Sequence, residues 1–301
     1  MTEAKKRRKL DGPIHSIGVV LREESPEVLE IINRLADWLE RRSISIVLEE
    51  QKEEGQASLD LNAYPVDLVI ALGGDGTLLR AARTVVGTEI PVLGVNLGRL
   101  GFLTAFPDAE LETGLMQVLD GNARLDHRFT LRAHIETEED RTRDLFALND
   151  IVVHTAGAAR VTPLTLDVGS IPDREEVGSF AADGVIVATP TGSTAYSMSA
   201  GGPIMVPDVE CIVITPICPH SLAVRPLVIP ASREIRVRSL HPGAEHQVTV
   251  DGQVERPLGA TEILVVAREE QSVALVRLPG QTFFGTLKKK LNWAARPPER
   301  A

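Results

Sequence analysis

The residues best suited to chemistry form a glycine-rich turn that carries a single carboxylate. The apolar run Val-Ile-Ala-Leu at 69–72 leads directly into Gly73-Gly74-Asp75-Gly76-Thr77. In open α/β sheets, ligands bind beyond the carboxyl ends of the strands, where glycines let the backbone approach a phosphate and the next helix offers N–H groups to the anion. Because an Asp repels phosphate, Asp75 suits another task, either accepting a proton from an attacking hydroxyl or helping to hold Mg²⁺. The alternative is a tight turn whose Asp caps the helix.

Two polar residues interrupt a second apolar segment. Asn149 and Asp150 stand within the run Ala147–His154. Burying a carboxylate without a partner is costly in free energy, so Asp150 needs a hydrogen-bonding partner, and the vicinal hydroxyls of a ribose would serve. The alternative is an ordinary Asn-Asp pair in a turn or at a strand edge.

A hydroxyl-rich stretch follows a third apolar segment. Ala182-Asp183-Gly184 precedes an expected strand, Val185–Ala188, and residues 189–203 then read Thr-Pro-Thr-Gly-Ser-Thr-Ala-Tyr-Ser-Met-Ser-Ala-Gly-Gly-Pro. Small side chains let a ligand lie against the backbone, hydroxyls and amides can bind a base and a sugar, and Tyr196 offers a ring for packing. This pattern predicts a nucleotide-binding segment. The alternative is a hydroxyl-rich surface loop.

The elements that position these motifs change character near residue 125. Before it, apolar residues alternate between strand and helix spacing, which predicts a doubly wound, largely parallel α/β domain over 15–125 after a disordered tail at 1–14. A helix is expected to begin at Ser25-Pro26, a cap followed by proline at the first helical position. The expected strands are Ile17–Leu21, Ser43–Leu48, Asp67–Leu72 and Ile90–Val95, and the further helices are Thr77–Val86 and Asp108–Leu119.

After residue 125, short segments rich in Val, Ile and Thr alternate with Gly, Pro and Asp turns. This pattern predicts a strand-rich, all-β domain over 126–280. A tail at 281–301, with a helix near Thr282–Trp293, is expected to follow and to pack back on the α/β domain. The strands expected here include Phe129–Ile135, Leu145–Val153, Leu164–Val168, Val185–Ala188, Ile212–Thr215, Ile235–Arg238, Gln247–Val250, Ile263–Val266 and Val273–Arg277.

Composition excludes several classes of function. The net charge of −10 argues against general nucleic-acid binding, which needs clustered Lys and Arg. The basic run Lys5–Lys9 is either a targeting arm or a solvated tail, and we expect the tail. No signal-peptide pattern or run of 18 apolar residues occurs, so we expect a cytoplasmic protein without a membrane span. The spacing of Cys211 and Cys218 does not suggest zinc binding, and we expect both thiols to be buried in a reducing compartment.

Together these motifs resemble the NAD kinase family. The glycine-rich Gly73–Thr77 turn resembles the family's phosphate loop, although phosphofructokinases and lipid kinases share that motif. The long segment from Asp183 to Pro203 resembles the family's nucleotide-binding signature and is far more specific. Further similar segments are Asn96–Thr104, Asp251-Gly252-Gln253, and the tail from Phe283 to Trp293.

The resemblance implies an alcohol-acceptor phosphotransferase that phosphorylates the 2′-hydroxyl of the adenosine ribose of NAD to give NADP. Asp75 would be the general base, and a divalent cation such as Mg²⁺ would accompany the donor, ATP or polyphosphate. Gly73, Gly74, Gly76, Thr77 and Arg80 would bind the donor phosphates. The residues expected to bind NAD are Asp75, Gly76, Phe102, Asn149, Asp150, Arg160, Asp183, Thr194, Ala195, Tyr196, Ser197, Met198, Ser199 and Gln253.

One residue departs from the family pattern. The family usually has Asn-Glu where this chain has Asn149-Asp150, so the carboxylate stands on a shorter stem. The resemblance also implies a homodimer or homotetramer, with nucleotide binding partly across a subunit boundary. Two alternatives stay open: a kinase of a lipid-type acceptor, disfavoured because no basic amphipathic helix is evident, and a non-catalytic NAD(P)-binding regulator on the same fold, disfavoured because Asp75 is present.

Overall fold

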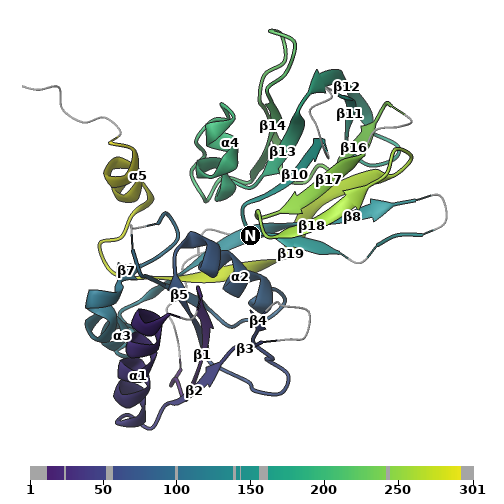
Figure 1. The fold of residues 1–301 in the computed structure, drawn as a ribbon. Coiled ribbons are helices and arrows are strands. Elements are labelled where there is room, and N and C mark those ends of the chain that lie inside the picture. The colour runs from purple at the N-terminus through teal and green to yellow at the C-terminus, as the bar shows by residue number, and fades with distance from the viewer. Residues whose placement is uncertain are drawn as a thin grey trace, which may run out of the picture. The chain divides into compact units, whose positions relative to one another are not determined.

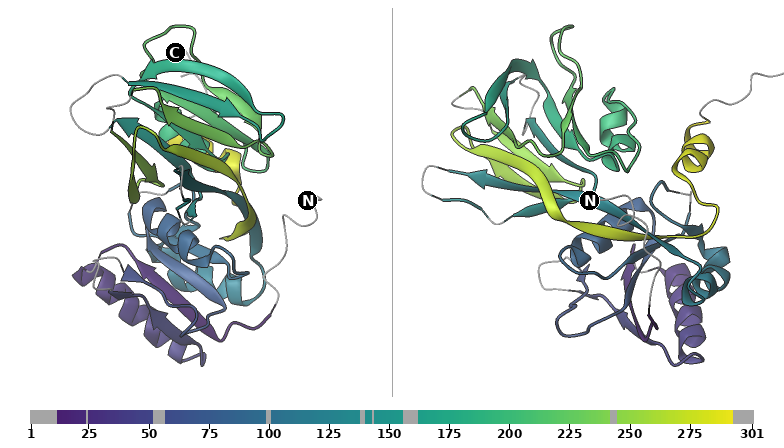
Figure 2. Two further views of the ribbon diagram at one scale, coloured as in Figure 1. Left: turned by 90° about the vertical axis from the view of Figure 1, so that its right-hand side faces the viewer. Right: turned by 180° about the vertical axis from the view of Figure 1, so that it is seen from behind.

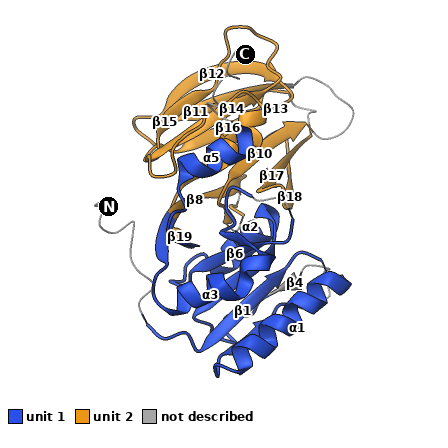
Figure 3. Cartoon of the chain, turned by 90° about the vertical axis from the view of Figure 1, so that its left-hand side faces the viewer, with its two compact units in different colours: residues 1–127, 273–301 blue, residues 128–272 orange. Residues whose placement is uncertain are grey.

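The chain forms two compact units. The computed structural model describes residues 12–23, 25–51, 57–98, 101–137, 140–142, 144–155, 162–241 and 245–292. Unit 1 comprises Met1–His127 with Val273–Ala301, and unit 2 comprises Arg128–Ser272 (Figure 3). Both boundaries fall inside strands, β8 (Arg124–Glu136) and β19 (Ile263–Arg277). Because no loop marks these boundaries, the sequence pattern predicts an end of the second domain at 280, whereas unit 2 ends at Ser272. The basic run Lys5–Lys9 lies outside the described residues.

Unit 1 is built on a parallel sheet with helices on both faces, as the sequence predicts (Figure 1). Its strands run in the order β6-β5-β1-β2, and every residue of β5 is buried, as a strand covered on both faces should be. A two-residue strand, β7 (Phe106–Pro107), pairs in parallel with β6. The four longer strands are β1 (Ser16–Leu21), β2 (Ser45–Leu48), β5 (Leu68–Gly73) and β6 (Val92–Asn96), and a short hairpin, β3 (Glu50–Gln51) with β4 (Ala57–Ser58), follows β2.

Three helices cover this sheet. Helices α1 (Pro26–Glu40) and α3 (Leu111–Leu119) share one core with side chains from a single face of β1 and β5. Helix α2 (Asp75–Val85) covers the other face, where a β-carbon added at Gly94 of β6 would lie 2.6 Å from Leu78 of α2. Helix α1 begins at the predicted cap, because the Ser25 hydroxyl accepts the N–H of Val28 at 3.3 Å. A 3₁₀ turn, η2 (Asp108–Glu110), occupies the expected first turn of α3.

The C-terminal helix α5 (Phe283–Leu291) belongs to unit 1. It is capped by Thr282, whose hydroxyl accepts the N–H of Gly285 at 3.1 Å. The Lys290 ammonium of α5 lies 5.8 Å from the centre of the Phe102 ring, which is a cation–π contact. No helix of the described residues is both long enough and apolar enough to cross a membrane.

Unit 2 is a sandwich of two mainly antiparallel sheets that share one apolar core (Figure 2). One sheet has six strands in the order β15-β14-β13-β10-β17-β18, and the other contains β12-β11-β16-β19 with β8 and β9. A short helix, α4 (Tyr196–Ser199), follows a 3₁₀ turn, η3 (Gly192–Thr194). The remaining strands are β9 (Leu145–Ala147), β10 (Asp150–Thr155), β11 (Thr162–Val168), β12 (Glu175–Ala182), β13 (Gly184–Ala188), β14 (Cys211–Ile217), β15 (Leu227–Pro230), β16 (Ile235–Ser239), β17 (His246–Val250) and β18 (Val254–Leu258).

The fold class is confirmed, but some elements differ from the expected ones. The strand expected over Leu145–Val153 is two strands, since the backbone between β9 and β10 turns aside to meet the Asp251 carboxylate. The two segments expected at 263–266 and 273–277 form one strand, β19. Cys211 is buried as expected, whereas Cys218 is exposed, because it lies just beyond the end of β14.

Candidate functional site

Asp75 is held in place by the backbone of a neighbouring loop in unit 1. Helix α2 begins at Asp75, and Gly74 before it has an extended backbone. The Asp75 carboxylate accepts the N–H of Phe102 at 2.8 Å on Oδ2 and the N–H of Leu103 at 3.0 Å on Oδ1. The structure therefore brings together two of the predicted motifs, the Gly-Gly-Asp-Gly turn and the 96–104 segment. Arg99 and Leu100 of that segment lie outside the described residues.

Two glycines are required by this packing. A β-carbon at Gly101 would lie 1.9 Å from Oδ1 of Asp75, so only glycine lets the loop come close enough for its N–H groups to reach the carboxylate. A β-carbon at Gly73 would lie 2.2 Å from Oγ1 of Thr77. At Gly74 no atom lies within 4 Å of such a β-carbon, and Gly76 is exposed. The turn is thus tightly packed at Gly73 and open at Gly74 and Gly76, which leaves room for a phosphate group at these two residues.

Arg80, predicted to bind donor phosphate, already has partners within unit 1. Its Nη2 donates to Oε1 of Glu49 at 2.7 Å and to the backbone carbonyl of Leu21. Glu49 also accepts the N–H of Leu21 at 2.7 Å. Burial raises the pKa of Glu49, while the Leu21 N–H and the Arg80 guanidinium oppose that shift. In this structure Arg80 ties helix α2 to the end of β1, and its phosphate contact stays a prediction.

Unit 2 contains a cavity of about 790 Å³ on the outer face of its six-stranded sheet. This volume lies within the range of small-molecule sites. Five of the predicted NAD-binding residues line it, namely Asn149, Asp150, Asp183, Ala195 and Tyr196. The structure therefore brings together the second and third motifs of the sequence, which stand more than thirty residues apart in the chain.

The polar residues at the floor of this cavity have unusual surroundings. Oδ1 of Asn149 is buried and has no hydrogen-bond partner among the residues that the structure describes. Asp150 is only 5% exposed, and burial, with the nearby charge of Asp251 as a lesser cause, raises the pKa of Asp150 to about 7. An acceptor without a donor, beside a carboxyl group in need of donors, suits a ligand that brings hydroxyl or amino groups.

Comparison with known proteins gives the family of the chain. Residues 17–123 match the model of the ATP-NAD kinase N-terminal domain, and residues 148–278 match that of the ATP-NAD kinase C-terminal domain. The chain belongs to the NAD kinase family. The resemblance inferred from the motifs is thereby confirmed.

Relatives and solved structures agree with this family assignment. The chain is 45% identical to the NAD kinase of Gemmatimonas aurantiaca over 87% of this chain and 91% of the relative. It is 40% identical to the NAD kinase of Solibacter usitatus over 94% of this chain and 99% of the relative. The structure is similar to yeast NADH kinase complexed with NADH, with a TM-score of 0.84, 26% identity and coverage of 96% and 90%. It is also similar to an Archaeoglobus fulgidus NAD kinase in complex with ATP, with a TM-score of 0.73, 27% identity and coverage of 92% and 98%.

Other residues predicted to bind NAD do not line the cavity of this family member. Ser197 lies on α4 with its side chain fully buried, and its hydroxyl lies 2.8 Å from Oγ1 of Thr215. Thr194 is buried, and its hydroxyl donates to the carbonyl of Thr191 at 3.3 Å. Gln253 follows the β17–β18 turn, where its N–H donates to Val250. Met198 and Ser199 lie on α4, and Arg160 lies outside the described residues. Their contacts with NAD stay predictions.

Sequence reasoning missed several lining residues that strand alternation could have found. Side chains two apart on a strand share a face, so Asp150 predicts that Val152 and His154 face the same cavity, as they do. Thr249 of the neighbouring strand β17 lines it too, and its hydroxyl lies 3.0 Å from Nε2 of His154. Cys218 and Asp251 also belong to the polar lining, but no pattern along the chain indicates that they meet Asp150 there.

Proposed function

We propose that this member of the NAD kinase family transfers the terminal phosphoryl group of ATP to the 2′-hydroxyl of the adenosine ribose of NAD, which gives NADP. The observation that carries the proposal is the Asp75 carboxylate, which stands at the start of α2 directly after the glycine turn and is fixed by two backbone N–H groups. The family assignment and the polar cavity of unit 2 support it.

Asp75 is suited to orient and deprotonate an attacking hydroxyl. Each carboxylate oxygen has about two lone pairs, and the N–H groups of Phe102 and Leu103 use one on each oxygen. The remaining lone pairs can accept the hydroxyl proton, while the two N–H groups prevent the carboxylate from rotating. The open side of the glycine turn and the first N–H groups of α2 would receive donor phosphate oxygens. Positioning and electrostatic stabilisation then supply most of the acceleration.

A divalent cation such as Mg²⁺ is proposed to arrive with the donor. Among the residues that the structure describes, no three His, Cys, Asp or Glu side chains are grouped so as to hold a metal ion. The Asp75 carboxylate beside the glycine turn fits an ion that is held mainly by the donor phosphates and water. When bound, the ion neutralises charge on the transferred phosphoryl group.

The cavity of unit 2 is proposed to recognise the acceptor. Asn149 and Asp150 offer acceptors to ribose hydroxyls or to an adenine amino group, and Tyr196 offers a ring at the rim. We further propose a cytoplasmic homo-oligomer, either a dimer or a tetramer, that uses ATP or polyphosphate. The regulator and the lipid-kinase alternatives find no support in these features, because the first has no need of a fixed Asp75 and the second requires an apolar acceptor site.

An activity assay tests the proposal directly. Purified protein is incubated with NAD, Mg²⁺ and ATP, or with polyphosphate in a parallel reaction, and an NADP-specific dehydrogenase detects the product. Wild-type protein is expected to form NADP, and Asp75→Asn to lose about 10²–10⁴-fold in kcat, as expected for a missing general base. Absence of NADP with either donor, together with tight NAD binding, would contradict the kinase proposal and favour a non-catalytic NAD(P)-binding regulator.

A further inference from the structure

The carboxylate of Asp251 collects the backbone N–H groups of three consecutive residues. It accepts from Leu148 at 3.0 Å on Oδ2, from Asn149 at 2.8 Å on Oδ1, and from Asp150 at 3.1 Å on Oδ1. In return, the N–H of Asp251 donates to the carbonyl of Asp150 at 2.9 Å. Leu148 and Asn149 form the break between β9 and β10, and Asp150 is the first residue of β10. A side chain therefore accepts the N–H groups where the chain passes from one strand to the next.

The hairpin turn between β17 and β18 places this carboxylate. Asp251 and Gly252 have φ angles of 51° and 65°, and the N–H of Gln253 donates to Val250 at 2.9 Å. Two successive residues with positive φ make a type I′-like turn, which Asp-Gly favours. Asp251 is nevertheless only 8% exposed and faces the cavity, so its side chain does more than the turn requires.

We propose that Asp251 is a positioning residue of the acceptor cavity, which holds the 148–150 backbone so that Asn149 and Asp150 face the nucleotide, and which couples nucleotide binding to the release of one proton. This inference rests on the proposed function for the identity of the ligand. The coupling follows because two carboxyl groups that share one cavity repel each other when both are ionised. A ligand whose hydroxyls donate to Asp150 favours the ionised form and displaces the proton.

Asp150 is the carboxyl group that holds this proton below about pH 7. Burial and the charge of Asp251 together raise the pKa of Asp150 to about 7. The other titratable groups that line the cavity are His154 on the same strand, Asp183 before β13, Tyr196 on α4 and Cys218 after β14. Among the lining residues, Asp251 is the one whose charge raises the pKa of Asp150. Because the ionised form binds the ligand, affinity for NAD should rise with pH through this range.

Calorimetric titration with NAD tests the coupling. Wild-type protein should bind NAD about tenfold more tightly at about pH 8 than at about pH 6, as linkage requires for a group with a pKa near 7. Binding at the lower pH should release about one proton per NAD. Asp251→Asn keeps the shape and tolerates positive φ but removes the charge, so this ratio should fall below about threefold. Glu255→Gln, which removes an exposed carboxylate from the same hairpin, should behave as wild type.

The variant Asp251→Gly tests the role of the carboxylate separately from the role of Asp251 in the turn. Glycine adopts positive φ readily, so the hairpin is retained while three N–H groups lose their acceptor, and NAD affinity should fall at least about tenfold at each pH. Affinity within about twofold of wild type would overturn the positioning role.

A titration without ligand keeps this inference separate from the proposed function. Carbon-13 NMR of the aspartate side chains of the unliganded protein should show the Asp150 midpoint near 7, and a lower midpoint in Asp251→Asn. An unchanged midpoint in the variant would show that the charge of Asp251 does not act on Asp150 and would overturn the inference, whatever the protein binds. If instead the midpoint shifts but NAD does not bind, the electrostatic interaction between Asp150 and Asp251 stands, and the proposed function fails.

Discussion

The Asp75 carboxylate lies 2.8 Å from the backbone N–H of Phe102, and this hydrogen bond joins the two glycine-containing motifs of unit 1. The first motif provides the carboxylate at the start of a helix, and the second provides the N–H groups that orient it. Gly101 of the second motif makes this close approach possible, since any larger residue would occupy the position of the carboxylate. The arrangement makes Asp75 a rigid group, which suits a base that must meet one hydroxyl in one geometry.

Gly101→Ala should disable the enzyme without unfolding it. The new methyl group would lie 1.9 Å from Oδ1 of Asp75, so the carboxylate must move and lose its backbone donors. We expect kcat to fall at least about tenfold, because small displacements at a reacting group are costly for the rate. Gly98→Ala is the matched control, since no atom lies within 4 Å of a β-carbon there. Equal kcat values for the two variants would contradict this account of Asp75.

The sequence predicted the layout of unit 1 well because its signals are local. Buried parallel strands are continuous apolar runs, and Ser25-Pro26 marks a helix start by its own chemistry. It also predicted that Asn149, Asp150, Asp183 and Tyr196 belong together. What it missed depends on contacts between distant segments: the partnership of Arg80 with Glu49, and the Asp251 carboxylate beneath residues 148–150. Edge strands such as β12 and β18 were missed because polar and charged side chains interrupt their apolar pattern.

Arg80→Ala distinguishes a structural role from a phosphate contact. Removing the guanidinium leaves the Glu49 carboxylate, 6% exposed, without its charged partner, and the variant should lose about 1–3 kcal/mol of unfolding free energy. Chemical denaturation measures this loss. If Arg80 binds donor phosphate as well, KM for ATP rises several-fold in Arg80→Ala. In Glu49→Gln, which keeps the arginine, KM for ATP should stay unchanged. A KM unaffected in both variants would remove Arg80 from the phosphate site.

His246 should make the protein less stable in mild acid. It is 2% exposed, and neither ring nitrogen has a hydrogen-bond partner among the described residues. Burial, and then the nearby His154, lowers the pKa of His246 from 6.5. Because the folded-state pKa lies below the unfolded value, this contribution to stability is present above about pH 6.5 and is lost as the pH falls toward the folded pKa. The neutral ring is favoured in the fold.

His246→Leu should therefore remove part of the acid sensitivity. Leucine suits a core position beside Val248, and the variant should gain about 1–2 kcal/mol relative to wild type as the pH falls from about 7 to about 5. Denaturant titrations at several pH values measure the difference. His220→Gln, at an exposed position, serves as the control and should follow the wild-type curve. A difference that does not depend on pH would mean that His246 does not titrate in this range.

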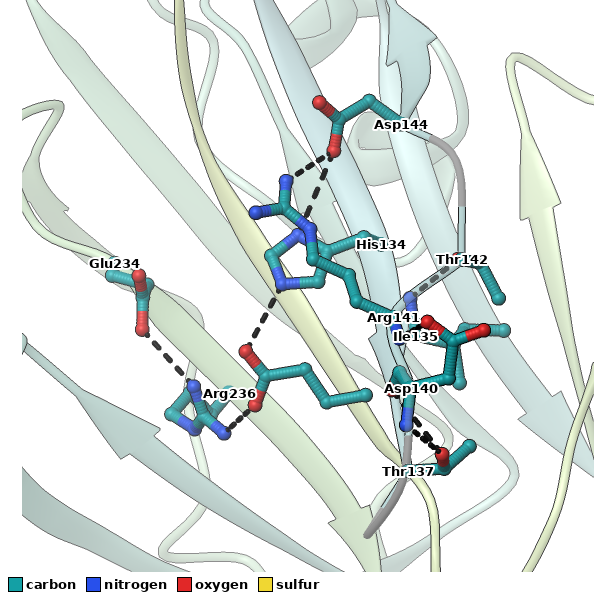
Figure 4. A network of polar contacts seen from close by, with 10 residues as sticks. His134, Ile135, Thr137, Asp140, Arg141, Thr142, Asp144, Glu234 and Arg236 are labelled. Carbon is teal, nitrogen blue, oxygen red and sulfur yellow. Dashed lines mark hydrogen bonds and ion pairs between the residues drawn. The ribbon is translucent and has the colours of Figure 1, made fainter.

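A network of charged side chains on unit 2 gives the last prediction (Figure 4). The Glu136 carboxylate accepts from Nη2 of Arg236, and its Oε1 lies 3.1 Å from Nε2 of His134. Nδ1 of His134 lies 3.8 Å from Asp144, and Arg236 also contacts Glu234 at 3.3 Å. The hydrogen bond from Arg236, with His134 as a smaller cause, lowers the pKa of Glu136 below 4.5. The stabilisation is therefore present above about pH 4.5 and is lost as the pH falls through the folded pKa.

Glu136→Gln should cost about 0.5–1 kcal/mol at neutral pH, a modest value because the Glu136 side chain is 34% exposed and solvent screens its charge. The cost should shrink as the pH falls from about 4.5 through the lowered folded-state pKa of Glu136, because the wild-type carboxyl group then becomes protonated as well. Glu176→Gln is the matched control, since that carboxylate contacts Arg238 at 3.4 Å but is 56% exposed, and its removal should cost nothing measurable. Equal losses in the two variants would show that the Glu136 network contributes no more than an exposed ion pair.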